Sequence, residues 1–273
     1  MNILFDMQLI NRNRLRSFRQ KDFSVYFLLD RVAKEIAFRL NMINQTFENA
    51  LELHGITGIV GYTCMETKKI HRMIRAEIST EFSTLKREVI SCPLEEIPSI
   101  SQSVDLILSP LNLHIINDTL EMFSKINHML KPGGMFLAAI PGIGTLHELR
   151  KALLKAETEL TGGASPRVIP FMDIKSAGTL MEKSGFISPI IDQDTYTVYY
   201  KSMLHLMHDL RGMGMSNPLI RRSKTPPYKS LFKRASTIYT EENSDLTGNV
   251  TASFSIIYVM GWKSTTFKTG TDE

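Results

Sequence analysis

The chain has little that would support a disulfide framework, a metal centre or a membrane span. Only two of its 273 residues are cysteines, Cys64 and Cys92. This scarcity excludes a disulfide-stapled fold and predicts a reducing compartment, which we take to be the cytoplasm. No group of Cys and His residues has the spacing of metal ligands, so we expect no metal. No segment approaches the roughly 18 apolar residues that a membrane-spanning helix needs.

The charge is mildly basic, with a formal net charge of +4, and 43% of the residues are hydrophobic. Basic residues gather in two segments, 12–21 and 221–234. The aromatic residues within the second segment are few, Tyr228 and Phe232, and single-stranded nucleic acid needs more stacking surface than that. We therefore interpret these segments as solvated basic faces and expect no nucleic-acid partner.

One stretch, residues 49–60, has the pattern around which the rest of the chain is organised. An apolar run ends near the acid Glu52, a short turn with Gly55 and Gly58 follows, and a new apolar run begins. The pattern is typical of a buried strand, a nucleotide-binding turn and the start of a helix. Glycines leave the backbone N–H groups and the helix N-terminus open to a ligand, and Glu52 can accept a hydrogen bond there. A simple tight turn is the alternative interpretation.

Strands and helices alternate after this turn. We expect a helix over residues 59–65, a helix over 119–130 capped by Asn117-Asp118, and strands over 70–76, 88–91, 104–109 and 135–140. This order predicts an α/β fold with a mostly parallel, doubly wound sheet. Glu77 ends the second strand, where such folds hold ribose hydroxyls on a carboxylate, although it could also be an ordinary surface residue.

The flanking segments complete one expected structural domain. An amphipathic helix is expected over 25–47, and helices are expected over 145–160, from Asp173 to near Gly185, and over 201–213. Strands are expected from residue 187 and over 251–262, with an irregular basic excursion up to about residue 240. The predicted parts are an N-terminal helical cap (1–48), a Rossmann-like core (49–200), a helical and basic insertion (201–250) and a closing strand with its tail (251–273).

The strand and glycine turn, Glu77, residues 104–109 and Leu130-Lys131-Pro132-Gly133-Gly134 together resemble the class I S-adenosylmethionine-dependent methyltransferases. Further motifs are similar to bacterial relatives of the mitochondrial complex I assembly methyltransferase-like factor, a group that neighbours the malonyl-carrier-protein methyltransferases. These motifs are residues 113–118, 145–150, 162–168, 209–214 and 261–262. The resemblance implies a seven-stranded sheet with an antiparallel last strand, and S-adenosylmethionine bound over the carboxyl ends of the strands.

The site residues follow from the strand ends and from this resemblance. The cofactor-binding candidates are Glu52, His54, Gly55, Thr57, Gly58, Glu77, Glu95 and Ser109. The catalytic candidates are His114, as a base, and Asn117, and the substrate-binding candidates are Asp118, Arg150 and Arg167. Alternatively, His114 packs against the next helix, Asp118 only caps it, and each arginine is tied to a nearby carboxylate.

The chain departs from the family's Gly-x-Gly-x-Gly turn, because the matching positions read His54-Gly55-Ile56-Thr57-Gly58. A positive φ at His54 or Ile56 would cost about 1 kcal/mol or more. An Asp that accepts the adenine amino group in the family is replaced near Cys92 and Pro93, which leaves Glu95 as a stand-in.

Three functional hypotheses remain. The first is a methyltransferase for a small molecule or a carrier-bound acyl group. The second is an assembly enzyme that modifies an arginine of a complex I subunit by methylation or hydroxylation. The third is an assembly factor that keeps the fold without catalysis.

Overall fold

The computed structural model describes residues 3–83, 89–98 and 104–265, and this part of the chain forms two compact units. Unit 1 contains the described residues of segments 1–26, 141–172 and 194–256. Unit 2 contains those of segments 27–140, 173–193 and 257–273. The four parts expected from the sequence stay a prediction, and the two units are described one at a time.

Seven strands form one sheet in the order β3-β2-β1-β4-β5-β7-β6. Their bounds are β1 Phe47–Leu53, β2 Ile70–Glu77, β3 Val89–Ser91, β4 Val104–Pro110, β5 Leu130–Pro141, β6 Phe186–Tyr200 and β7 Val250–Lys263. Strands β1 to β5 pair in parallel, and the last strands are antiparallel. The predicted doubly wound, Rossmann-like α/β fold is therefore confirmed.

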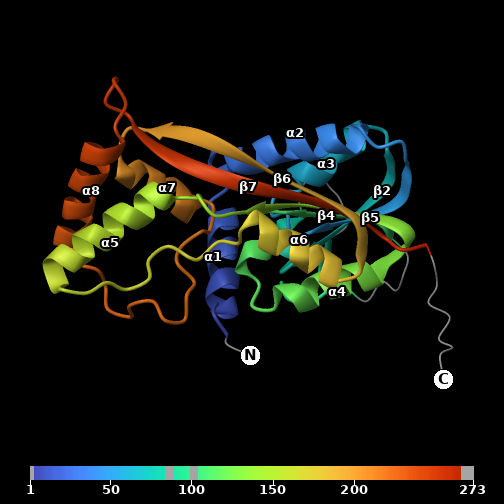
Figure 1. Cartoon of the computed structure of the whole chain (residues 1–273), viewed down its shortest axis with the longest axis horizontal. Coiled ribbons are helices and arrows are strands. Elements are labelled where there is room, and N and C mark those ends of the chain that lie inside the picture. The colour runs from blue at the N-terminus through green and yellow to red at the C-terminus, as the bar shows by residue number, and fades with distance from the viewer. Residues whose placement is uncertain (1–2, 84–88, 99–103, 266–273) are drawn as a thin grey trace. The chain divides into compact units, whose positions relative to one another are not determined.

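The core of unit 2 is built on the apolar parallel strands. Leu106, Ile107 and Leu108 of β4 are all fully buried, as expected for a strand that is covered on both faces. The helices in this unit are α2 (Phe27–Asn41), α3 (Ile59–Glu66), α4 (Thr119–Met129) and α6 (Ile174–Lys183). In Figure 1, α2 and α3 lie together on one side of the strands, and α4 and α6 lie together on the other.

The helix starts in unit 2 follow the expected capping chemistry. Asp118 accepts a hydrogen bond from the backbone N–H of Glu121 at 2.8 Å, and Asp173 accepts one from that of Ser176 at 2.7 Å. These bonds satisfy N–H groups that have no partner within the helix. The bonds from Ser176 also lower the pKa of Asp173.

Unit 1 is largely helical, with α1 (Met7–Arg19), the 3-10 turn η1 (Phe23–Tyr26), α5 (His147–Thr161), α7 (Met203–Gly212) and α8 (Lys229–Asn243). Helices α5 and α8 pack side by side. Glu242 of α8 forms ion pairs with two lysines of α5, Lys151 at 2.9 Å and Lys155 at 3.0 Å. Ion pairs therefore join α5 and α8 in addition to their packing contact.

Two expected elements were wrong, and the helix expected over 25–47 ends earlier, at Asn41. The irregular basic excursion contains helix α8, whose buried Leu231, Ala235, Ile238 and Tyr239 have the spacing of a helical core face. Strand β5 begins at Leu130, five residues before the expected start at residue 135, and an irregularity after Leu130 shifts its register against β4. Residue 88, where the third strand was expected to begin, lies outside the described residues.

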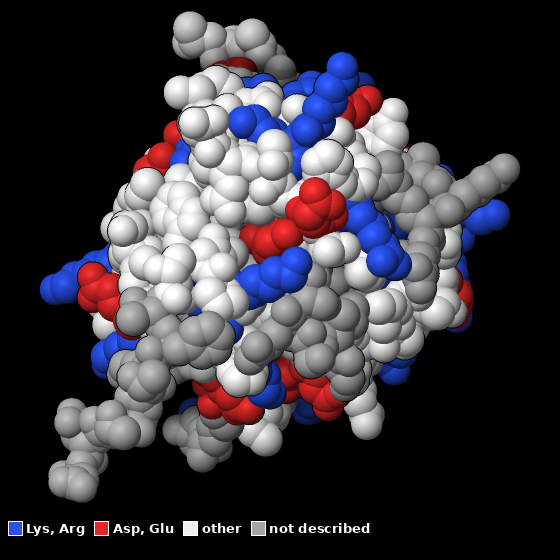
Figure 2. Space-filling model, turned by 90° about the vertical axis from the view of Figure 1, so that its right-hand side faces the viewer, with Lys and Arg blue, Asp and Glu red and all other residues white. Residues whose placement is uncertain are grey.

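The surface charge and the helix lengths relate to two classes that the sequence argued against, nucleic-acid-binding and membrane-spanning proteins. On the face shown in Figure 2, acidic and basic side chains are interspersed. Among the ion pairs of unit 2, Lys131 Nζ lies 3.5 Å from Asp105 Oδ2. Among the residues described, no helix is long and apolar enough to cross a membrane.

Candidate cofactor site at the carboxyl end of β1

The register of the parallel strands brings three candidate residues to one edge of the sheet. Leu53 of β1 is level with Ala76 of β2, and Glu52 is level with Leu108 of β4. Glu52, Glu77 and Ser109 therefore lie where their strands end, and all three are fully buried. In doubly wound sheets this edge is where ligands bind.

The turn between β1 and α3 has the backbone of a Gly-x-Gly-x-Gly turn, although His54 and Ile56 replace two of its three glycines. The φ angles of His54, Ile56 and Gly58 are +54°, +60° and +74°, so all three positions of the Gly-x-Gly-x-Gly pattern are left-handed. His54 donates its backbone N–H to the carbonyl of Ala76 at 2.8 Å, which fixes the turn to β2. The expected strain at His54 and Ile56 is present, at about 1–2 kcal/mol for each residue.

Three charged side chains form a buried cluster beneath this turn, and we name Glu52, Arg75 and Glu77 the ion cluster. Arg75 Nε lies 3.2 Å from Glu52 Oε2, and Arg75 Nη2 lies 3.0 Å from Glu77 Oε1. None of the three side chains is more than 1% exposed. Arg75 also donates to the carbonyls of Phe82 and Ile56, each at 3.1 Å. A buried charge needs such partners, because its desolvation costs several kcal/mol.

The small residues of the turn make room for the ion cluster. A Cβ at Gly55 would lie 2.1 Å from Glu52 Oε1, and a Cβ at Gly58 would lie 2.6 Å from Arg75 Cζ. A Cβ at Gly61, in the first turn of α3, would lie 2.7 Å from Glu52 Oε2. In this structure the space above these glycines is therefore filled by the chain's own side chains.

The fit to an adenosine-type cofactor differs between backbone and side chains. The left-handed turn and the position of Glu77 at the end of β2 match what such a ligand requires. The side chains do not match, because Glu77 Oε1 already accepts from Arg75 and, at 2.8 Å, from the backbone N–H of Ile56. His54 is itself fully buried. In this conformation Glu77 is therefore closed to a ribose.

The remaining candidates of unit 2 lie along the segments after β3 and β4. Glu95 accepts a hydrogen bond from the backbone N–H of Asn117 at 2.7 Å, so these two predicted residues are brought together. Ser109 donates to the side chain of Asn112. His114 is buried in the short 3-10 helix η3 (Leu113–Ile115). Asp118 is the cap of α4 described above, which matches the alternative interpretation of that residue.

The two candidate arginines lie in unit 1 and have partners of their own. Arg167 donates from Nε and Nη2 to the two carboxylate oxygens of Glu157, at 3.0 and 2.6 Å, and Ser165 donates to the same carboxylate. Arg150 donates to the carbonyl of Ile169 at 2.5 Å. Arg167 is thus tied to a carboxylate, as the alternative interpretation expected, whereas Arg150 is tied to the backbone.

Two further kinds of chemistry would need metal ligands or reactive thiols. Residues 3–83, 89–98 and 104–265 contain no group of His, Cys, Asp and Glu that could hold a metal ion. Burial raises the pKa of Cys92 to about 11 and that of Cys64 still further, so both thiols stay protonated at neutral pH.

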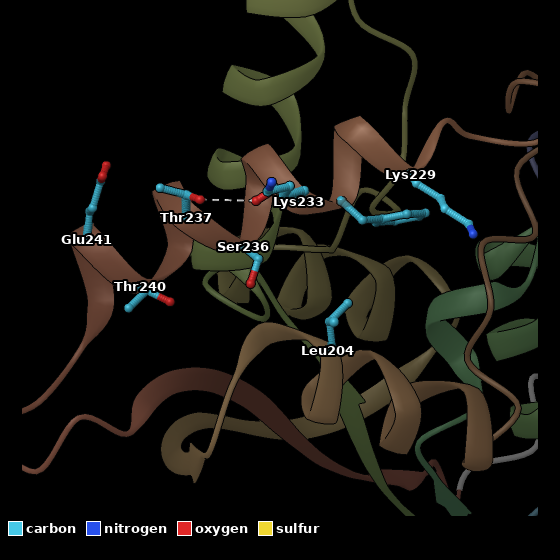
Figure 3. Close-up of a pocket in the computed structure, with 8 residues that line it drawn as sticks. Leu204, Lys229, Lys233, Ser236, Thr237, Thr240 and Glu241 are labelled. Carbon is cyan, nitrogen blue, oxygen red and sulfur yellow. Dashed lines mark hydrogen bonds between the residues drawn. The ribbon is translucent and has the colours of Figure 1, made fainter.

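An open groove of about 690 Å³ lies in unit 1. Figure 3 shows Leu204 of α7 pointing toward α8, which contributes Lys229, Phe232 and Ser236 to the lining. The rest of the lining comes from Lys233, Thr237, Thr240 and Glu241, so side chains of both charges face the groove, and none of the predicted site residues is among them.

Sequence reasoning missed Arg75 as a member of the site. The available signal was its position two residues before Glu77, because alternate residues of a strand point to the same face. An arginine on the same face as a buried acid predicts an ion pair.

Comparisons with known proteins agree with this fold. Residues 58–138 match a family described as a methyltransferase domain. The human protein "Arginine-hydroxylase NDUFAF5, mitochondrial" is 33% identical over 95% of this chain and 77% of its own length. A malonyl-[acyl-carrier protein] O-methyltransferase from Xylella fastidiosa is 32% identical over 62% of this chain and 55% of its own length. The structure of YcgJ from Bacillus subtilis superposes with a TM-score of 0.57 at 11% identity, over 84% of this chain and 97% of that one, which supports the fold alone.

Proposed function

Because the chain belongs to the family of the arginine-hydroxylase NDUFAF5, we propose that it is an enzyme that modifies an arginine of a respiratory complex I subunit during assembly. The observation that carries this proposal is the extent of the similarity. It runs through 271 aligned residues, so it includes the methyltransferase domain and the later motifs of unit 1. The similarity to the carrier-protein methyltransferase covers only 62% of the chain. This difference favours an arginine of a complex I subunit over a carrier-bound acyl group as the substrate.

S-adenosylmethionine is the cofactor of the methyltransferase domain that this chain contains. It supplies a methyl group on a sulfonium, which an aligned nucleophile can take by in-line displacement. We propose that the turn at residues 54–58 and Glu77 hold it, once Glu77 is accessible. His114 is the proposed base for a nucleophile that must lose a proton, and it lies just beyond β4.

A second candidate function is an assembly factor without catalysis. The ion cluster favours it, because the chain's own guanidinium occupies the carboxylate that would hold the ribose. The side chains of His54 and Ile56, where the family has glycine, support the same alternative. In this function the chain would bind the complex I subunit and leave it unmodified.

The cytoplasmic location stays a prediction, and the name of the human relative describes that protein as mitochondrial.

The test is to incubate the purified protein with S-adenosylmethionine and complex I subunits from the same organism, and then to map modified arginines by mass spectrometry. A malonylated carrier protein serves as the alternative substrate. We expect a methyl increment on one arginine, with S-adenosylhomocysteine as the other product, and we expect it to be lost in a folded His114→Gln variant. A hydroxyl increment is tested in a second incubation that also contains dioxygen and a reductant, because S-adenosylmethionine supplies no oxygen atom. His71→Gln is the matched control, because His71 is exposed on β2. Stable binding of a subunit without any increment would support the non-catalytic function instead.

A further inference from the structure

Every nitrogen of the Arg75 guanidinium has a partner within the candidate site. Its three guanidinium nitrogens contact four groups, namely Glu52, Glu77 and the carbonyls of Ile56 and Phe82. These partners come from β1, β2, the turn before α3 and the segment after β2. The guanidinium therefore joins the parts of unit 2 that a cofactor at this edge would have to contact.

The contact with Glu77 concerns the ligand directly. One carboxylate can accept from both hydroxyls of a ribose, which is why an acid at the end of the second strand suits a nucleoside. Here Glu77 Oε1 already accepts from Arg75 Nη2 at 3.0 Å and from Ile56 at 2.8 Å. Since the Glu77 side chain is only 1% exposed, an incoming ribose must first separate Arg75 from Glu77.

We propose that Arg75 is a built-in competitor of the cofactor, whose guanidinium occupies the ribose acceptor Glu77 until a ligand displaces it. This inference rests on the proposed function for the identity of the ligand, and it adds a residue that sets the affinity. The observed affinity of a site is reduced by the fraction of molecules in which the site is open. If about one molecule in ten has Arg75 displaced, removing the guanidinium tightens binding about tenfold.

The test is calorimetric titration of the full-length protein and its Arg75→Met variant with S-adenosylhomocysteine, adenosine and 2′,3′-dideoxyadenosine. We expect Arg75→Met to bind the first two about tenfold more tightly than the native chain. The gain should vanish for the dideoxy compound, which lacks the hydroxyls, and in the Arg75→Met/Glu77→Gln double variant. Arg72→Met is the matched control, because Arg72 is exposed on the same strand, and it should bind like the native chain.

Circular dichroism first establishes that each variant is folded, and Arg75→Gln replaces Arg75→Met if the latter is not. Equal or weaker binding of S-adenosylhomocysteine by the Arg75 variant would overturn the proposal without affecting the proposed function. Binding by the variant alone would support the role of Arg75 and contradict cofactor use by the native chain. Absence of binding by both proteins would overturn both proposals.

Discussion

The backbone N–H of Ile56 donates a hydrogen bond to Glu77 Oε1 at 2.8 Å, across 21 positions of the sequence. Ile56 has a φ of +60°, an unfavourable conformation for a β-branched residue. The turn is therefore kept in a strained conformation by a buried carboxylate on the neighbouring strand. Arg75 shares that carboxylate, so turn geometry, ion pairing and access to Glu77 depend on one another.

Glu77→Gln is expected to destabilise the protein by about 3 kcal/mol, because it leaves the buried Arg75 with one carboxylate partner fewer. Urea unfolding at neutral pH measures this loss. Glu48→Gln is the control, since the Glu48 side chain is 73% exposed and its replacement should change stability by at most about 0.5 kcal/mol. Equal stability of the two variants would show that the ion pair contributes nothing.

Ile56→Gly and Ile56→Ala test the strain at the turn. Both variants lose the contacts of a side chain that is 8% exposed, and both should be less stable than the native chain. At a position with negative φ, a variant with Gly is less stable than the variant with Ala, but a positive φ reverses this order. We expect Ile56→Gly to be the more stable of the two by about 1 kcal/mol in urea unfolding. The same pair of substitutions at Thr57, which is not among the residues with positive φ, should give the ordinary order.

The fold could be predicted because it follows from local patterns. The apolar run of β4, the cap at Asp173 and the acid at the end of β2 each have a local physical cause that the sequence displays. Helix α8 shows the limit of this approach. Its core positions have a clear helical spacing, but the prolines and basic residues before it drew the interpretation toward a loop.

The state of the candidate site could not be predicted in the same way. Sequence placed Glu52 and Glu77 at the strand ends, and the register brings both to one edge. The pairing of Arg75 with both acids is a tertiary contact, set by which side chains share the buried space beneath Gly55 and Gly58. Such a contact depends on packing that local propensity does not contain.

Cys64 and Cys92 are expected to be unreactive in the folded protein. Burial raises the pKa of both thiols, and the thiolate is the reactive form. A thiol-specific reagent at about pH 8 should label neither cysteine in the native protein and both in urea. Leu246→Cys provides a positive control at a fully exposed position. Rapid labelling of Cys64 or Cys92 without denaturant would mean that unit 2 opens readily.

Glu157 is expected to make stability depend on pH. Hydrogen bonds from Arg167, and then from Ser165, lower the pKa of Glu157 below its ordinary value of 4.5. Its folded pKa lies below its unfolded pKa, so the stabilisation is complete above about pH 4.5 and is lost as the pH falls through the folded value.

The measurement is the difference in unfolding free energy between the native chain and Glu157→Gln, followed from about pH 7 to pH 3. We expect about 1 kcal/mol at neutral pH, since the Glu157 side chain is only 12% exposed, and a difference near zero at the acidic end. Glu159→Gln is the matched control, because Glu159 pairs with Arg234 through side chains that are 38% and 40% exposed. Solvent screens that pair, so its difference should be much smaller at every pH. A Glu157 difference that does not change with pH would show that the charge of Glu157 contributes nothing to stability.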